Sequence, residues 1–269
     1  MDSDFETSEA DVPLPYIENA ARQRRRRVLL LAGTAEARNL AVALSREPYL
    51  MMTVSLARPE RMPFNYRRPV RIGGWGGEKA YRNWLIREGI DIVIDATHPF
   101  AEEMSKRTAK LASELGIEAV RFMRPQWMPT KDDNWTFLNV PEEAADHMAE
   151  DATVFLATGR RDLLRFSNLE PRRVLCRVRD MPETPIPFAD GEYLVTRGAL
   201  SIDDEIDLFD QHKVDWVVTR NSGGPGGWPK LEAARVLGLP VAVLRRPPPA
   251  DMLRISTVAE TLNWVRRRK

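Results

Sequence analysis

The sequence predicts an α/β protein with two lobes, each built around a parallel sheet, and a cleft between the lobes. Short apolar runs alternate with amphipathic helical stretches from Val28 onward, and this pattern is typical of parallel sheets covered by helices. Glycine-containing turns follow several of the apolar runs, where a strand would lead into a helix. The length of 269 residues exceeds the usual domain size of about 100–150 residues, which favours two domains.

The first half of the pattern contains the better-marked elements. Strands are expected at residues 28–32, 53–57, 92–96 and 118–122, with a further candidate at 136–138. Helices are expected at residues 35–45, 78–88 and 99–115. The third helix is well marked because Pro99 suits a first helical position and because Glu102 and Lys106 are spaced to form an ion pair.

The second half repeats the alternation. After a helical segment at 141–149, strands are expected at 153–157, 174–178, 193–196, 216–219 and 241–244, and helices at 163–166, 202–211, 230–237 and 258–266. We therefore predict two Rossmann-like or flavodoxin-like lobes, residues 28–150 and 151–269, with a boundary near residues 148–152. Similar turns open the two lobes, Leu31-Ala32-Gly33-Thr34 and Leu156-Ala157-Thr158-Gly159, and we interpret them as shared turn chemistry.

Residues 1–27 differ from the remainder of the chain. They begin acidic and proline-bearing and become arginine-rich from Arg22 to Arg27, without hydrophobic periodicity. Such a segment cannot bury enough apolar surface to offset its chain entropy, so we expect a disordered extension. The arginines at 24–27 could contact nucleic acid or a membrane, but a solvated approach to the first strand explains them more simply.

Composition excludes several classes of function. The formal net charge of +1 lacks the basic excess typical of nucleic-acid binding. Cys176 is the only cysteine, which excludes an internal disulfide and a thiolate metal cluster and indicates a reducing compartment. The widely spaced His98, His147 and His212 do not predict a metal site, and no run of about 18 apolar residues predicts a membrane span. We expect a cytoplasmic monomer with no metal, nucleic-acid or membrane partner.

The turn after the first expected strand is a candidate cofactor site, made of Gly33, Thr34, Ala35, Glu36 and Ala37. A strand, a glycine turn and a helix N-terminus can hold a phosphate through backbone N–H groups and the helix dipole. The turn has one glycine where a dinucleotide fingerprint has three, so a purely structural turn explains it equally well. Thr34 could donate its hydroxyl to a phosphate, and Glu36 could reach a ribose or cap the helix.

The next strand ends indicate which dinucleotide would bind. Enzymes that use the unphosphorylated nicotinamide cofactor usually place a carboxylate where the adenosine ribose arrives, whereas this chain has Ser55 and Arg58 there. An arginine suits a 2′-phosphate, which favours NADPH, although Arg58 could equally be an ordinary surface cation. Gly73 and Gly74 lie in a glycine-dense stretch that would let a flat ligand approach the backbone closely, or would simply form a flexible turn.

The run from Asp91 to Ala101 is the most informative part of the chain. An apolar strand delivers Thr97 and His98 to the start of a helix, and parallel sheets place ligand sites where strand ends meet helix N-termini. Taken alone, such a turn is more often a satisfied helix cap than a reaction centre. Its position relative to the other strand ends favours a ligand site.

The second lobe contains a matching candidate for an anionic ligand. Asn221, Ser222, Gly223 and Gly224 follow an expected strand, and Lys230 lies at the start of the next helix. Free N–H groups, a hydroxyl and an ammonium group suit a carboxylate-rich ligand, although a plain loop is the alternative. Three arginines that follow expected strands could point into the cleft or be surface charges: Arg124, Arg160 and Arg197.

Together these residues resemble the precorrin-6A reductases of the cobalamin pathway, from about Val28 to the C-terminus. Two positions depart from the family pattern, because Ala32 stands where the family often has glycine and Arg220 where lysine is frequent. The segments that show the resemblance are Gly33-Thr34-Ala35-Glu36-Ala37-Arg38, Arg71-Ile72-Gly73-Gly74, Asp95-Ala96-Thr97-His98-Pro99-Phe100-Ala101, Asn221-Ser222-Gly223-Gly224, Lys230 and Ala233-Ala234-Arg235.

The resemblance implies NADPH-dependent reduction of one double bond of precorrin-6A, a contracted tetrapyrrole with many acetate and propionate groups, to give precorrin-6B. His98 is the candidate for orienting the nicotinamide or relaying a proton, because histidine titrates near neutral pH. The remaining residues divide between two roles. The cofactor would contact residues 33–37, Arg58, Gly73, Gly74, Thr97 and His98, and the substrate would contact Phe100, Arg124, Arg160, Arg197, residues 221–224 and Lys230.

Other functions remain as alternatives. A two-lobed binding module without chemistry would use the same cleft, and the equivalent reductase could act on the cobalt-containing intermediate. A short-chain reductase is disfavoured because no tyrosine is followed by a lysine four residues later. Phosphoryl transfer is disfavoured because the chain has no Gly-Lys-Ser/Thr phosphate loop.

Overall fold

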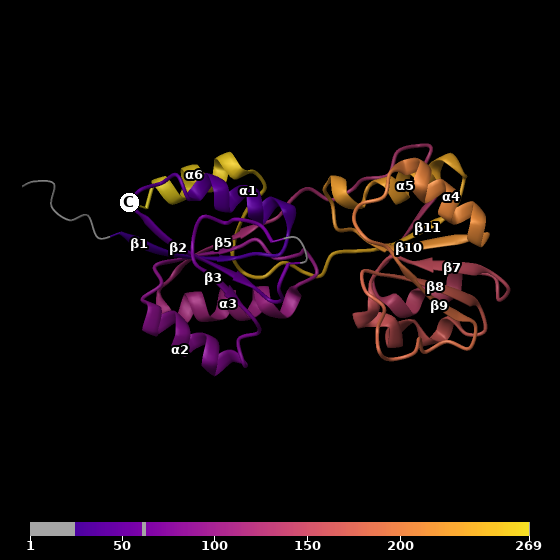
Figure 1. Ribbon diagram of the computed structural model, residues 1–269, viewed down its shortest axis with the longest axis horizontal. Coiled ribbons are helices and arrows are strands. Elements are labelled where there is room, and N and C mark those ends of the chain that lie inside the picture. Colours follow the sequence, from indigo (N-terminus) through magenta and orange to yellow (C-terminus); the bar gives the residue numbers. More distant parts are fainter. Residues whose placement is uncertain (1–24, 61–62, 269) are drawn as a thin grey trace, which may run out of the picture.

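In the computed structural model, which describes residues 25–60 and 63–268, the chain forms two lobes side by side (Figure 1). Each lobe is a six-stranded sheet in which every paired strand runs parallel to its neighbour. Helices cover both faces of each sheet (Figure 1). The predicted α/β class is therefore confirmed. Residues 1–24, which make up most of the expected extension, lie outside the described residues.

The first sheet has the strand order β12-β5-β4-β1-β2-β3. Its strands are β1 (Arg26–Leu31), β2 (Leu50–Leu56), β3 (Val70–Ile72), β4 (Ile92–Asp95), β5 (Glu118–Phe122) and β12 (Leu253–Ile255). Helices α1 and α6 cover one face, and α2 and α3 cover the other (Figure 1). These helices are α1 (Ala35–Leu44), α2 (Glu78–Glu88), α3 (Glu102–Leu115) and α6 (Val258–Arg266).

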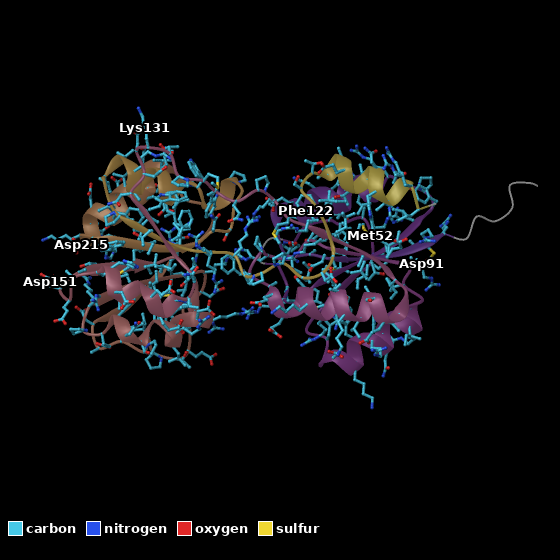
Figure 2. The ribbon with its side chains drawn as sticks, turned by 180° about the vertical axis from the view of Figure 1, so that it is seen from behind. Met52, Asp91, Phe122, Lys131, Asp151 and Asp215 are labelled. Atoms are coloured by element: carbon cyan, nitrogen blue, oxygen red, sulfur yellow. The ribbon has the colours of Figure 1, made fainter. Side chains whose placement is uncertain are left out.

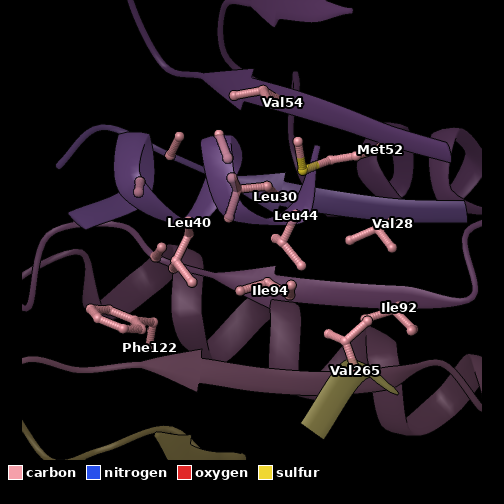
Figure 3. Packing of buried hydrophobic residues seen from close by; sticks show 14 of the residues in the cluster. Val28, Leu30, Leu40, Leu44, Met52, Val54, Ile92, Ile94, Phe122 and Val265 are labelled. Carbon is pink, nitrogen blue, oxygen red and sulfur yellow. The ribbon is translucent and has the colours of Figure 1, made fainter. Parts of the chain in front are cut away.

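Period-two alternation along the strands divides the first core into two layers. Figure 3 shows the layer beneath α1 and α6, where apolar side chains of β1, β2 and β4 meet Leu40, Leu44 and Val265. The intervening strand residues point to the opposite face and pack against α2 and α3. That second layer contains Leu29, Leu31, Val93, Tyr81, Leu85 and Leu111.

The second sheet has the strand order β6-β11-β10-β7-β8-β9. Helices α4 and α5 pack on one face, and the 3-10 helices η1 and η2 pack on the other (Figure 1). The strands are β6 (Trp135–Leu138), β7 (Thr153–Leu156), β8 (Arg173–Val178), β9 (Gly191–Val195), β10 (Trp216–Arg220) and β11 (Val241–Leu244). The helices are η1 (Pro141–His147), η2 (Arg160–Leu169), α4 (Ile202–His212), η3 (Pro225–Gly227) and α5 (Pro229–Val236).

The two lobes exchange their edge strands. β6 pairs with β11 of the second sheet, although it precedes the expected boundary near residues 148–152. β12 follows the whole second lobe, yet it pairs with β5 of the first sheet. The chain therefore crosses between lobes twice, over residues 123–134 and 245–252. The division at residue 150 was wrong, because local periodicity identifies a strand but not the sheet in which the strand pairs.

The strand orders of the two sheets correspond position by position. β1 and β7 occupy the fourth place in their sheets, and β4 and β10 occupy the third. The similar turns at 31–34 and 156–159 follow β1 and β7. The sequence similarity between these turns thus marks a repeated topology, which was interpreted from the sequence as shared turn chemistry only.

Smaller differences concern element types and ends. β3 and β12 were not expected, and the helical segments expected near 141–149 and 163–166 are the 3-10 helices η1 and η2. The third helix begins at Glu102, because Pro99 lies in a turn closed by the Ala101 N–H, which donates to the His98 carbonyl at 2.8 Å. In the part of the chain that the structure describes, no helix has the length and apolar character needed to cross a membrane.

Candidate active site

The carboxyl-terminal ends of both sheets face the region between the lobes. Figure 2 shows Asp91, which precedes β4, at one outer end of the molecule, and Asp151 and Asp215, which precede β7 and β10, at the other. Phe122, at the carboxyl end of β5, lies between these extremes (Figure 2). Because ligands of parallel α/β sheets bind beyond the carboxyl ends of the strands, a ligand in this region would meet both lobes.

The β1–α1 turn combines an open glycine with a capped helix. Gly33 has a φ of +132° and nothing within 4 Å of the position where a Cβ would lie. The Thr34 hydroxyl accepts the Ala37 N–H at 3.1 Å and donates to the Ala96 carbonyl at 3.0 Å, so it links β1 to the end of β4. The N–H groups of Ala35 and Glu36 stand in the first turn, where an α-helix has no internal acceptors for them.

Glu36 and Arg124 join the two lobes. The Arg124 guanidinium donates to the Glu36 carboxylate at 2.6 Å and to the Ser222 carbonyl at 2.7 Å. A Cβ on Gly224, which has a φ of +73°, would lie 2.9 Å from Arg124 Cδ and 3.1 Å from Glu36 Oε1. Glu36 was expected at a ribose and Arg124 at the substrate, but the structure brings them together in a contact between lobes.

Arg246, which sequence reasoning missed, fastens the two crossovers together. Its guanidinium donates to the carbonyls of Asn221 at 2.9 Å, Arg124 at 2.7 Å, Pro125 at 3.1 Å and Ser222 at 3.0 Å. Burial and the neighbouring arginines lower the pKa of Arg246 to about 10. No sequence signal distinguishes this residue from the adjacent Arg245, because its acceptors come from distant segments.

A buried ion pair supports the Thr97–His98 turn from below. Asp95 is fully buried and pairs with Arg121, which is 3% exposed. Asp95 also accepts the hydroxyls of Thr97 and Ser105 at 2.7 Å each. Arg121 in turn donates to the Thr97 hydroxyl at 2.7 Å and to the His98 carbonyl at 3.0 Å. The turn is thus held by charge-assisted hydrogen bonds. The sequence signal that could have indicated this support is Arg121, a charged residue next to the apolar end of the expected strand 118–122.

His98 is neutral in the free protein. Its Nδ1 accepts the Phe100 N–H at 3.2 Å, which assigns the remaining ring proton to Nε2. Burial, together with the charges of four arginines, lowers the pKa of His98 to about 4. The expectation that His98 titrates near neutral pH was therefore wrong. The four arginines, in decreasing order of effect, are Arg124, Arg220, Arg246 and Arg121.

Arg71 shapes the glycine-rich loop after β3. Its guanidinium donates to the Gly73 carbonyl at 2.6 Å and to the Gly74 carbonyl, and it stacks over the Trp75 ring at 3.7 Å. Burial lowers the pKa of Arg71. No atom lies within 4 Å of where a Cβ would stand on Gly73 or Gly74, so the loop presents open backbone. Arg58 is exposed just beyond β2, which pairs directly with β3.

Two predicted ligand residues of the second lobe, Asn221 and Lys230, form hydrogen bonds within the protein. The Asn221 side chain accepts the Trp127 N–H at 2.8 Å and donates to the Trp127 carbonyl at 3.0 Å, which fixes the first crossover. Lys230 is 7% exposed, and its ammonium group donates to the Gly227 carbonyl at 2.6 Å. Burial lowers the pKa of Lys230 to about 8. Both residues hold the loop around Gly224 in place and do not present free polar groups.

Other predicted residues of the second lobe lie at its carboxyl edge. Phe100 reaches across from the first lobe, packs against the second core, and lies 5.4 Å from the Arg220 guanidinium. Arg160, at the start of η2, and Arg197, after β9, are exposed. The Ser222 hydroxyl forms no hydrogen bond within residues 25–60 and 63–268. Across the same residues, no three histidine, cysteine or acidic side chains are grouped so as to hold a metal ion.

Comparison with known proteins identifies the family. The model of the family "Precorrin-6x reductase CbiJ/CobK" matches residues 27–266. A precorrin-6A reductase of Mycobacterium tuberculosis (strain ATCC 25618 / H37Rv) is 39% identical over 243 residues, which cover 89% of this chain and 97% of the relative. A cobalt-precorrin-6A reductase of Priestia megaterium is 31% identical over 232 residues, covering 82% and 90%.

A solved structure agrees with the sequence relatives. The CobK precorrin-6A reductase superposes with a TM-score of 0.82 at 34% identity, covering 90% of this chain and 96% of that chain. The similarity therefore extends over both lobes and both crossovers. The chain belongs to the precorrin-6x reductase family CbiJ/CobK and is an oxidoreductase.

Proposed function

We propose that this protein uses NADPH to reduce one double bond of precorrin-6A, giving precorrin-6B, a step of cobalamin biosynthesis. The observation that supports this most strongly is the family match along residues 27–266, which includes every strand end facing the gap between the lobes. Hydride transfer requires the donor and acceptor carbons at near-attack distance. Two sheets with facing carboxyl edges suit this requirement, because each lobe can hold one of the two reactants.

The first lobe fits NADPH at three strand ends. The open backbone at Gly33 and the free N–H groups of Ala35 and Glu36 suit a pyrophosphate. Gly73 and Gly74 offer uncovered backbone for a flat group, and Arg58 offers an exposed guanidinium for a 2′-phosphate. NADPH would supply the hydride, and these residues would fix the position from which it leaves.

The second lobe would hold the tetrapyrrole. Arg160, Arg197 and the free hydroxyl of Ser222 stand at its carboxyl edge and suit acetate or propionate groups. Phe100, which projects from the first lobe to the second, would provide an apolar surface beside the ring. Asn221 and Lys230 would contribute by holding the loop that presents Ser222, Gly223 and Gly224.

His98 would act as a neutral hydrogen-bond donor. Its Nδ1 is occupied by the Phe100 N–H, so the Nε2–H is the group that can face a ligand. Because the pKa of His98 is about 4, the imidazole would not bring a proton of its own at neutral pH. It would therefore orient the nicotinamide carboxamide or pass on a proton taken from solvent, while Thr97 and the Asp95–Arg121 pair hold its backbone.

The metal-free substrate is favoured over the cobalt-containing one. Curated relatives named for precorrin-6A are 33–39% identical to this chain, whereas those named for cobalt-precorrin-6A are 24–31% identical. The higher identity supports precorrin-6A, with the cobalt form as the second candidate.

The test is anaerobic incubation with NADPH and either tetrapyrrole, following the absorbance of the reduced nicotinamide and of the macrocycle together. Oxidation of NADPH in step with loss of precorrin-6A would support the proposal, and faster turnover of the cobalt form would reassign the substrate. Binding of tetrapyrrole without NADPH oxidation would instead support a binding module without chemistry.

A further inference from the structure

A hollow of about 380 Å³ opens beside the gap between the lobes, where the two crossovers pass the end of β12. Its wall is formed by residues 123–126 of the first crossover, Arg246 of the second, residues 254–256 and Glu260. The volume equals about a dozen water molecules at roughly 30 Å³ each. This volume is sufficient for one acidic side arm of a larger ligand.

The wall of the hollow carries an excess of positive charge. Arg124, Arg246 and Arg254 line it, against the single carboxylate of Glu260. That carboxylate already accepts the Thr257 N–H at 3.0 Å and the Thr257 hydroxyl at 2.9 Å, as part of the capping of α6. It is therefore held at the helix terminus and pairs with no arginine in the described part of the chain.

Among the residues that the structure describes, two of the three guanidinium groups have no carboxylate partner. Arg246 donates only to carbonyl oxygens, and its lowered pKa reflects burial beside other arginines. Arg254 is exposed and forms no ion pair with any residue of 25–60 or 63–268. Its register neighbour on β5 is Arg121, whose charge is already paired with Asp95. The unpaired guanidinium groups are therefore those of Arg246 and Arg254, and an anion entering the hollow between them would offset their mutual repulsion.

Most of this hollow lies away from the proposed phosphate sites, and among the described residues only the Arg124–Glu36 ion pair connects the two. It lies at the ends of β5 and β12, whereas the β1–α1 turn and Arg58 lie at the ends of β1 and β2. With about 4.8 Å between neighbouring strands, β5 is about 10 Å from β1 and about 14 Å from β2. Phosphates bound at β1 and β2 would leave this end of the sheet free for the other reactant.

We propose that this hollow is an oxyanion site that anchors one carboxylate arm of the tetrapyrrole, with Arg254 as the residue that contacts the arm. The inference rests on the proposed function for the identity of the ligand. Arg124 and Arg246 form the inner wall, and both also act on His98, so an arm anchored here belongs to a ring lying over the Thr97–His98 turn. Arg254 lies on the outer side of the hollow, where the carboxylate would replace the water that solvates its guanidinium group.

The test compares Arg254→Gln with Arg87→Gln, which removes a similarly exposed arginine from α2. In steady-state kinetics, Arg254→Gln should raise KM for precorrin-6A by roughly tenfold, as expected for loss of a hydrogen bond to a charged group. KM for NADPH and kcat should stay within about twofold, and Arg254→Lys should restore part of the loss. Arg87→Gln should change none of these constants.

Two results would overturn the assignment. A rise in KM for NADPH alone would show that the anion is a cofactor phosphate, and unchanged constants would show that Arg254 contacts neither reactant.

A binding measurement keeps this test separate from that of the proposed function. If wild-type protein fails to reduce either tetrapyrrole, titration calorimetry with tricarballylate, a small tricarboxylate, still tests the oxyanion site. Binding to wild type and Arg87→Gln that weakens roughly tenfold in Arg254→Gln would uphold the site while the reaction is reassigned. Equal affinity in all three proteins would refute the site, whatever the kinetics show.

Discussion

Arg124 and Glu36 form an ion pair at 2.6 Å, although 88 positions separate them in the chain. Glu36 stands in the first turn of α1, beside the proposed cofactor turn, and Arg124 also donates to the Ser222 carbonyl of the second lobe. The pair therefore connects the site for one reactant to the loop that faces the other. Its two side chains are 17% and 19% exposed, so water only partly screens the interaction.

Glu36→Gln should lower kcat by about tenfold, because loosening the contact between lobes relaxes the distance between hydride donor and acceptor. KM for NADPH should stay the same or fall, since the change removes a negative charge next to a phosphate site. Steady-state kinetics check both constants. Glu60→Gln is the matched control, because Glu60 pairs with Arg38 of the same helix but within the first lobe. An increased KM for NADPH with unchanged kcat would instead indicate that Glu36 contacts the ribose of NADPH.

His98 should make the protein less stable as the pH falls. The unfolded chain binds a proton on this histidine near pH 6.5, whereas the folded protein resists it down to about 4. The free energy of unfolding therefore keeps its full contribution from the neutral imidazole above pH 6.5. This contribution, up to about 3 kcal/mol, is lost as the pH falls from 6.5 to about 4.

The measurement is urea unfolding across that pH range, with NMR titration of the ring. His98→Asn, whose side-chain oxygen can still accept the Phe100 N–H, should flatten this part of the stability profile. An ordinary ring titration near pH 6.5 in the folded wild type would contradict the prediction.

Gly223→Ala should destabilise the fold by more than about 3 kcal/mol. Gly223 has a φ of +67°, and an added methyl group would overlap the Pro125 carbonyl and the Arg246 guanidinium, so both crossovers would have to move. Gly226→Ala is the control in the same loop, since its methyl group would enter open space. Chemical denaturation compares the two variants. Similar denaturation midpoints would show that the crossovers accommodate the added methyl group at little cost in stability.

Arg58→Ala should weaken the preference for NADPH over NADH by about tenfold, because a guanidinium paired with a 2′-phosphate forms charge-assisted hydrogen bonds. The ratio of kcat/KM for the two cofactors measures this. Arg46→Ala provides the comparison, because Arg46 is also exposed but lies before β2, at the opposite end of the strand. A parallel loss with both cofactors would remove Arg58 from the 2′-phosphate site.

Hydrophobic periodicity predicted the buried strands, and with them the fold class, but it did not predict the exposed edge strands. The central strands β1, β4, β7, β10 and β11 are almost wholly buried, so they appear as apolar runs. β3 and β12 have three residues each and are largely exposed, so no apolar run marks them. The exchange of edge strands depends on pairing across distant segments, which local patterns do not encode.

For the site, the sequence identified the strand ends that face the gap between the lobes, but it did not show which side chains pair with one another there. Thr97 and His98 were located because strand, turn and helix follow one another directly. Glu36 and Arg124 were assigned to ligands because nothing local shows that they pair with each other. Lys230 looked like a free cation, yet its position on the buried face of α5 makes it a structural donor.

The exchanged strands make each lobe depend on the other for a complete sheet. A fragment ending at residue 150 would lack β12 along the outer side of β5 and would retain β6 without β11 to bind it. Unsatisfied backbone donors and acceptors of this kind promote association with other chains. Each lobe therefore needs a strand from the other part of the chain to complete its sheet, so we expect the two lobes to fold as one cooperative unit.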